Sequence, residues 1–224
     1  MKNLNLNREH FDISNIPEAY VTGEAYFYNE VYKVTPDVLI PRPDTERVVD
    51  KVIEYLPPNG SLLDFCTGSG CIVISAICAR KDCTAIAVDI SAPAIEIAKY
   101  NSILNGADER IEFITADINS IDIAEKYDII VSNPPYIRTD VIAELDVSVK
   151  NYEPLTALDG GSDGMEFYRI ILNRFADNVK PGGFIIFEIG YDQADDIKKL
   201  CGHYADIKIY KDYGGNDRVA VIKI

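Results

Sequence analysis

The run Asn133-Pro134-Pro135-Tyr136 follows the apolar segment Asp128 to Val131 and has residue types suited to holding a primary amide or amine. Its two prolines remove two backbone donors and restrict φ, so the nearby carbonyls are fixed and free to accept hydrogen bonds. The Asn133 side chain adds another acceptor, and Tyr136 would form a flat wall. Such a pocket can hold both hydrogens of a planar NH2 group. The structural alternative is a proline-rich exit from a strand.

An amide or exocyclic amine is a poor nucleophile because its nitrogen lone pair is delocalised. Acceptors placed along its N–H bonds would favour a pyramidal nitrogen and free the lone pair for attack. Orientation would then supply much of the catalysis, with no strong general base required before the transfer.

A second group of residues is suited to a nucleoside. The turn from Asp64 to Cys71 contains small residues that let the backbone approach a ligand closely, although it lacks the third glycine of a pyrophosphate site. Asp89 ends the next apolar segment, where an acid commonly accepts both ribose hydroxyls. Asp117 is a candidate acceptor for an adenine amino group. A plain structural turn remains open for Asp64 and Asp117, and a helix-start acid for Asp89.

These motifs follow short apolar segments that we predict to be strands. The predicted strands are 61–65, 83–89, 110–115, 127–133, 183–189, 205–211 and 217–223, and the predicted helices are 71–80, 91–104, 164–178 and 193–201. This alternation predicts an α/β fold with a mostly parallel sheet and helices on both faces. Residues 134–163 form a long non-periodic stretch after a strand, which is typical of a functional loop.

The chain before this region has its own signals. Residues 26–40 are rich in β-branched and aromatic residues around Thr35-Pro36-Asp37, which predicts a strand or hairpin. Asp44 is the expected N-cap of a helix whose apolar face ends before Pro57-Pro58.

Composition limits the classes of function. The chain has 224 residues with a net charge of −14, which argues against a bulk DNA or RNA binder. No apolar run is long enough for a membrane span, and the first residues lack the core of a signal peptide. The 5 cysteines match no common zinc spacing, so no metal site is predicted. We expect a cytoplasmic protein.

The sequence resembles the protein-(glutamine-N5) methyltransferases of peptide chain release factors, the HemK/PrmC family. The similarity rests on the NPPY run, the Asp64 turn, Asp89 and, most specifically, the segment Leu39-Ile40-Pro41-Arg42-Pro43-Asp44-Thr45-Glu46. It extends from about Tyr20 to the C-terminus through further segments: Tyr20 to Glu24, Glu153 to Leu158, Gly160 to Gly164, Lys180 to Gly183, Glu188 to Gly190, Asp212 to Gly214, and Arg218-Val219.

The resemblance implies a class I S-adenosylmethionine-dependent methyltransferase with a Rossmann-like, seven-stranded, mostly parallel sheet of order 3-2-1-4-5-7-6. It also implies three sets of site residues. Catalysis would fall to Asn133, Pro134 and Tyr136; substrate binding to these together with Pro135, Arg42, Pro43 and Glu46; and cofactor binding to Asp64, Phe65, Cys66, Thr67, Gly68, Asp89, Asp117, Ile118 and Asn133. The cofactor would be S-adenosyl-L-methionine, the product S-adenosyl-L-homocysteine, and the protein partner a release factor.

Two features depart from the family pattern, one residue in the turn after Asp64 and the segment before Tyr20. Cys66 stands where the family usually has glycine. Cysteine is small enough to keep the turn if φ there is negative, so we expect weaker rather than absent cofactor binding. Family members usually carry a helical docking domain before Tyr20. We therefore expect residues 1–25 to be an appendage, a remnant of that domain, and residues 26–224 to be the catalytic domain with a leading hairpin at 26–40.

The expected function is methylation of a glutamine side-chain amide, that of the GGQ loop of a release factor. Two alternatives stay open. The acceptor is another amide or amine, such as a small molecule or a nucleobase, or the chain is a cofactor-binding module without catalysis.

Overall fold

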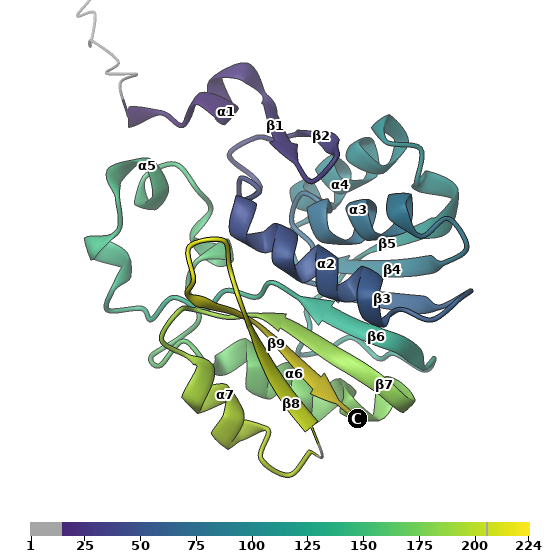
Figure 1. Cartoon of the computed structure of the whole chain (residues 1–224). Coiled ribbons are helices and arrows are strands. Elements are labelled where there is room, and N and C mark those ends of the chain that lie inside the picture. The colour runs from purple at the N-terminus through teal and green to yellow at the C-terminus, as the bar shows by residue number, and fades with distance from the viewer. Residues whose placement is uncertain (1–14, 205) are drawn as a thin grey trace, which may run out of the picture.

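A seven-stranded sheet forms the centre of the computed structural model, which describes residues 15–204 and 206–224 (Figure 1). Its strands are β3 (Ser61–Phe65), β4 (Thr84–Asp89), β5 (Ile111–Thr115), β6 (Tyr127–Ser132), β7 (Val179–Glu188), β8 (Asp206–Lys211) and β9 (Asp217–Lys223). Their spatial order is β5-β4-β3-β6-β7-β9-β8, and β9 pairs antiparallel with both neighbours, whereas the other pairs are parallel. Counted from β3, this order is 3-2-1-4-5-7-6, so the predicted topology is confirmed.

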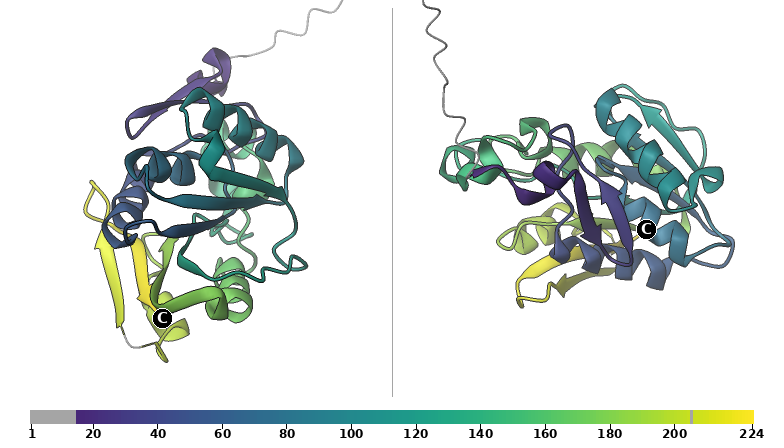
Figure 2. Two further views of the ribbon diagram at one scale, coloured as in Figure 1. Left: turned by 90° about the vertical axis from the view of Figure 1, so that its right-hand side faces the viewer. Right: turned by 90° about the horizontal axis from the view of Figure 1, so that it is seen from above.

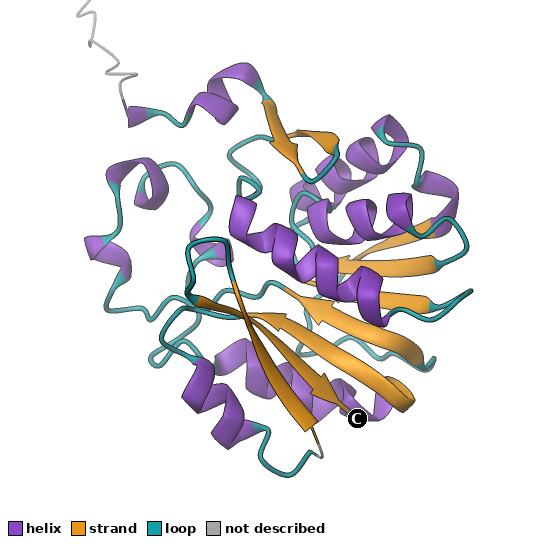
Figure 3. Ribbon diagram, in the orientation of Figure 1, coloured by secondary structure: helices purple, strands orange, loops and turns teal. Residues whose placement is uncertain are grey.

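Helices cover both faces of the sheet (Figure 3). One face carries α2 (Glu46–Tyr55), α3 (Cys71–Ala79) and α4 (Ala92–Leu104), and the other carries α6 (Glu166–Phe175) and α7 (Ala194–Leu200). The α4 helix begins directly after β4 because Ser91 caps it, its hydroxyl accepting a hydrogen bond from the Ala94 N–H at 3.2 Å. A short connection therefore joins the carboxyl end of β4 to a helix.

Alternate strand residues enter two separate apolar cores. Leu62 and Ile129 pack with α2 and α3, whereas Leu63 and Ile130 pack with α6, and all four are fully buried. Because both faces are covered, the strands are nearly continuous apolar runs in the sequence, and this made them recognisable.

The chain before the sheet forms a hairpin that is shorter than the predicted 26–40. It consists of β1 (Glu24–Phe27) and β2 (Glu30–Lys33), and the chain turns at Thr35, whose carbonyl accepts the Val38 N–H at 3.1 Å. In Figure 2 the purple hairpin lies outside the sheet beside the helices that cover one face. The Lys33 N–H donates to the Asn101 side chain of α4 at 2.7 Å, which holds the hairpin to the domain.

The prediction that Asp44 caps a helix is wrong. A 3-10 turn (Pro43–Thr45) precedes α2, and Thr45 takes the cap position without a side-chain hydrogen bond. The Asp44 carboxylate lies 3.8 Å from the Arg218 guanidinium, a partner that local sequence does not contain.

The described part of the expected appendage 1–25 includes α1 (Glu18–Thr22), while residues 1–14 lie outside the described residues. The Tyr20 hydroxyl donates to the Val38 carbonyl at 2.7 Å. The helix is therefore tied to the segment that leads to α2.

Candidate functional site

A cavity of about 460 Å³ lies at the carboxyl ends of β3, β4, β5 and β6. The segments that follow these parallel strands meet at one edge of the sheet. Ten of the residues predicted from the sequence line this cavity: Arg42, Phe65, Cys66, Thr67, Gly68, Asp89, Asp117, Ile118, Asn133 and Pro135. The other five predicted residues do not line it: Asp64, Pro134, Tyr136, Pro43 and Glu46.

Asp64 is buried beneath the turn that follows β3. Its Oδ2 accepts the Thr67 hydroxyl at 2.6 Å, and its Oδ1 is buried without a hydrogen-bond partner among the described residues. Burial raises the pKa of Asp64 to about 8, opposed by the hydrogen bond from Thr67. With that pKa Asp64 holds a proton near pH 7, and a cationic ligand group bound nearby would favour its ionised form.

The turn itself differs from the expectation for Cys66. Its φ is +59°, so the negative φ that would let cysteine replace glycine without strain is not found, and the backbone is held in the left-handed region that favours glycine. Gly68 also has a positive φ, +55°, and nothing lies within 4 Å of the position of a Cβ there. Burial raises the pKa of the Cys66 thiol, which keeps it neutral. The turn therefore presents an uncharged, backbone-rich wall to the cavity.

Asp89 is fixed at the end of β4 by two backbone donors. Its Oδ2 accepts the Gly68 N–H at 2.8 Å and its Oδ1 accepts the Ser91 N–H at 2.9 Å. Burial raises the pKa of Asp89, and the two hydrogen bonds oppose that rise. Each carboxylate oxygen keeps a lone pair for a further donor, as two adjacent hydroxyls require.

Asp117 and Ile118 line the cavity after β5. The Asp117 Oδ1 accepts the Asn119 N–H at 2.8 Å, so the carboxylate also forms the local turn that the sequence left open. Ile118 is buried and adds an apolar surface.

The NPPY run leaves β6 next to this wall. Asn133 and Pro135 line the cavity, while Pro134 is buried behind them. The Ser132 hydroxyl donates to the Phe65 carbonyl at 2.6 Å, which joins the ends of β6 and β3. The Tyr136 hydroxyl turns away from the cavity wall and donates to Glu188 Oε1 at 3.2 Å.

The segment before α2 contributes one cavity residue from the three predicted there. Arg42 lines the cavity and pairs with the buried Glu153 carboxylate. Pro43 is exposed, and Glu46 accepts the Tyr28 N–H at 2.9 Å, so Glu46 holds the hairpin to α2. Glu153 thus joins this segment to the loop 134–163.

Several cavity residues were not predicted individually. They come from the loop 134–163, which contains α5 (Val147–Lys150), from the start of α6, and from the segment before α2: Leu155, Thr156, Ala157, Asp159, Glu166, Phe167, Val38 and Leu39. The length of the loop and its lack of periodicity were the available signal. Which of its side chains face the cavity depends on its fold.

Within residues 15–204 and 206–224, no group of three or more His, Cys, Asp and Glu side chains is placed to hold a metal ion. Nor does the described chain contain a helix with the length and apolar character needed to cross a membrane.

Comparisons with known proteins agree with this architecture. A sequence model of the family described as methyltransferase small domain matches residues 47–149. A methyltransferase from Pyrococcus furiosus superimposes with a TM-score of 0.63 at 20% identity, over 86% of this chain and 87% of that one. The hMettl16 catalytic domain superimposes with a TM-score of 0.69 at 15% identity, over 92% and 89%. Fold and matched domain together define a class I methyltransferase with a Rossmann-like sheet.

Sequence relatives narrow the class to one family. The chain is 39% identical to the release factor glutamine methyltransferase of Clostridium acetobutylicum, over 96% of this chain and 79% of that protein. It is 42% identical to the protein of the same name from Fusobacterium nucleatum, over 92% and 60%. The chain belongs to the release factor glutamine methyltransferase family, as the resemblance predicted.

Proposed function

We propose that this chain transfers a methyl group from S-adenosylmethionine to the side-chain amide nitrogen of a glutamine in a peptide chain release factor, the glutamine of its GGQ loop. The observation that carries the proposal is the position of Asn133 and Pro135 on the wall of the cavity that Asp89 and the Cys66–Gly68 turn also line. An amide-binding run and a nucleoside-type site thus share one cavity, in a chain of this family.

The cavity residues fit the proposed cofactor. Asp89 has one free lone pair on each carboxylate oxygen for the two ribose hydroxyls. Asp64 is buried and does not line the cavity, and the positive sulfur of the cofactor would act on it only by favouring its ionised form. Asp117 and Ile118 would border the adenine. When bound, S-adenosylmethionine supplies a methyl group made electrophilic by the positive sulfur.

The NPPY run would hold the acceptor amide. The side-chain carbonyl oxygen of Asn133 and a backbone carbonyl of the proline pair would each accept one N–H of the glutamine side chain. These two hydrogen bonds would fix the direction of the nitrogen lone pair. The amide loses one proton to solvent after the methyl group is transferred. Arg42 would close the site on the substrate side, held there by Glu153.

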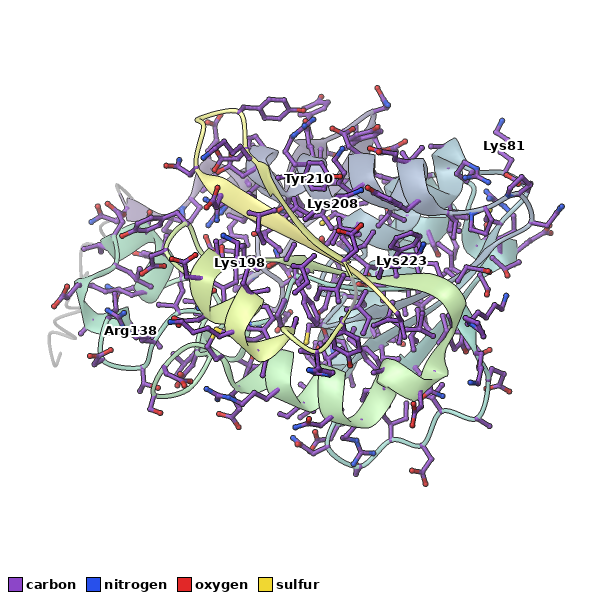
Figure 4. All side chains as sticks on the ribbon, turned by 60° about the horizontal axis from the view of Figure 1, so that its bottom comes forward. Lys81, Arg138, Lys198, Lys208, Tyr210 and Lys223 are labelled. Carbon is purple, nitrogen blue, oxygen red and sulfur yellow. The ribbon has the colours of Figure 1, made fainter. Side chains whose placement is uncertain are left out.

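The charge pattern favours a protein acceptor over a nucleic acid. The net charge is −14, and some of the surface lysines are paired with neighbouring aspartates. Lys198 of α7 and Lys208 of β8, both labelled in Figure 4, pair with Asp195 and Asp206 at 3.2 and 3.6 Å.

Because release factors act on the ribosome, a cytoplasmic location is part of this proposal. The division into an N-terminal appendage and a catalytic domain remains a proposal as well.

The test is to incubate the purified chain with labelled S-adenosylmethionine and an unmethylated release factor, and to map the label by peptide mass spectrometry. Label on the GGQ glutamine is the expected result. Label only on another amide or amine would overturn the assignment of the acceptor. Cofactor binding without transfer to any acceptor would favour a non-catalytic module.

A further inference from the structure

Four residues of the segments that carry the family resemblance have no role in the proposed chemistry, yet their side chains form a network around Tyr136. They are Asp44, Glu188, Asp212 and Arg218. Glu188 ends β7, and its neighbour Phe187 pairs with Ser132 of β6, so Glu188 lies beside the start of the NPPY run. We propose that Glu188 and Arg218 are positioning residues that hold Tyr136 and, through it, the segment Asn133–Pro135 on the cavity wall.

The Tyr136 hydroxyl takes part in a directed chain of hydrogen bonds. Arg218 Nη1 donates to the hydroxyl at 3.4 Å, and the hydroxyl donates to Glu188 Oε1 at 3.2 Å. Arg218 is itself fixed, since it donates to Asp212 Oδ2 at 3.1 Å and to the Ile189 carbonyl at 3.2 Å. A hydroxyl that both accepts and donates to anchored groups has one preferred orientation.

The backbone of Tyr136 is held as tightly as its side chain. Gln193 is buried, and its Nε2 donates to the Tyr136 carbonyl at 3.0 Å and to the Gly164 carbonyl at 3.1 Å. A Cβ at Gly160 would lie 2.7 Å from Tyr136 Cα, and one at Gly164 would lie 2.4 Å from the Tyr136 carbonyl oxygen. The two glycines therefore allow residues 160–164 to pack directly on the backbone of Tyr136.

The charges around Tyr136 are costly for a purely structural element. Glu188 is 3% exposed, and its Oε2 has no hydrogen-bond partner within the described chain. Desolvating a carboxylate usually costs more than an apolar side chain of the same size would, so stability alone does not explain its presence. Burial raises the pKa of Glu188, while the Thr45 hydroxyl, the Arg218 guanidinium and the Tyr136 hydroxyl oppose the rise and the Asp44 carboxylate adds to it. A role in orienting Tyr136 explains why these charged side chains are kept in a buried position.

This inference rests on the proposed function and is tested by a double-mutant cycle with E188M and Y136F. Methionine matches glutamate in size and removes the acceptor. We expect each single variant to lower kcat about tenfold or more, because small displacements in a site that depends on orientation are expensive. We expect the double variant to be no slower than Y136F, because both changes remove the same link. E188Q, which keeps an acceptor oxygen, should restore kcat to within about threefold of the wild type.

The controls separate positioning from general damage. All variants should bind S-adenosylhomocysteine with the Kd of the wild type. The variant D128N, which removes a carboxylate near the amino end of β6, at the other end of the strand from the NPPY run, should keep full activity. Additive losses in the cycle, or no rescue by E188Q, would overturn the positioning role. If E188M does not fold, R218K with Y136F provides the same cycle.

A crystal structure of E188M gives a readout that does not depend on the acceptor. We expect a displaced Tyr136 ring, and an unmoved ring would overturn the positioning role whatever the acceptor is. If the wild-type chain transfers no methyl group while the ring moves in E188M, the proposed function fails and the positioning role stands.

Discussion

Replacing Asp89 with alanine tests the cofactor site most directly. In the structure this carboxylate accepts one backbone N–H on each oxygen, from Gly68 and Ser91, and retains one lone pair on each for a ligand. A ribose with two free hydroxyls would use both. Hydrogen bonds to a charged acceptor contribute about 1.5–3 kcal/mol each. Even at the lower limit, two lost bonds amount to about 3 kcal/mol, or about 150-fold in Kd.

The assay is calorimetric titration with S-adenosylhomocysteine and with its 2′,3′-dideoxy analogue. The variant D89A should lose about 150-fold in affinity for the first ligand and little for the second, because the analogue has no hydroxyls to lose. The analogue therefore separates ribose binding from any change in the turn, whose Gly68 N–H also loses its acceptor. Asp82 offers a matched control, since it is an exposed aspartate that accepts the Asn59 N–H at 2.8 Å outside the cavity. The variant D82A should bind both ligands like the wild type.

Equal losses for the two ligands would refute the reasoning. Asp89 would then act only by holding the turn after β3, and the ribose would lie elsewhere. Unchanged binding of S-adenosylhomocysteine would remove Asp89 from the site altogether.

Three further predictions follow from the same cavity. The variant N133A should lower kcat by about 100-fold, since it removes one acceptor for the target amide, while calorimetry should show that binding of S-adenosylhomocysteine is largely preserved; unchanged turnover would exclude Asn133 from substrate binding. The variant C66G should raise the free energy of unfolding by about 0.5–1 kcal/mol in urea titrations, because the relief of left-handed strain exceeds the added backbone entropy; a loss of stability would show that the thiol packs usefully. The raised pKa of Asp64, about 8, means that the folded state holds a proton which the unfolded state releases near pH 4. Stability should therefore fall as pH rises from about 4 to 8, by at most about 1.4 kcal/mol per pH unit, and D64N should lack that slope; matching pH profiles would show that Asp64 ionises normally.

The fold was accessible from local patterns. Strands buried on both faces are short apolar runs, and the helices between them begin soon after each strand ends, so the alternation alone predicted the sheet. The strand order came from the resemblance rather than from the alternation, and it is confirmed. Residues placed directly after strands, such as Asp89 and Asn133, could be assigned to one edge because parallel strands end together.

Predictions failed or stayed incomplete where the deciding contact is distant in sequence or depends on backbone conformation. Asp44 is a good local cap, but a 3-10 turn takes its place and Arg218 lies near its carboxylate. Glu46 is two residues further along, and it binds the hairpin instead of lining the cavity. The sequence left the sign of φ at Cys66 open, and the structure shows that it is positive.

The sequence by itself therefore determined the class of fold, the family and the edge of the sheet at which the chemistry is expected. Only the tertiary structure decided whether each side chain faces the cavity or contacts other parts of the chain. The Tyr136 hydroxyl meets Glu188 and Arg218, which are 52 and 82 residues away along the chain, and turns from the cavity that Asn133 and Pro135 line. A sequence motif fixes residue types and spacing, whereas the direction of a side chain depends on partners that the folded chain brings together.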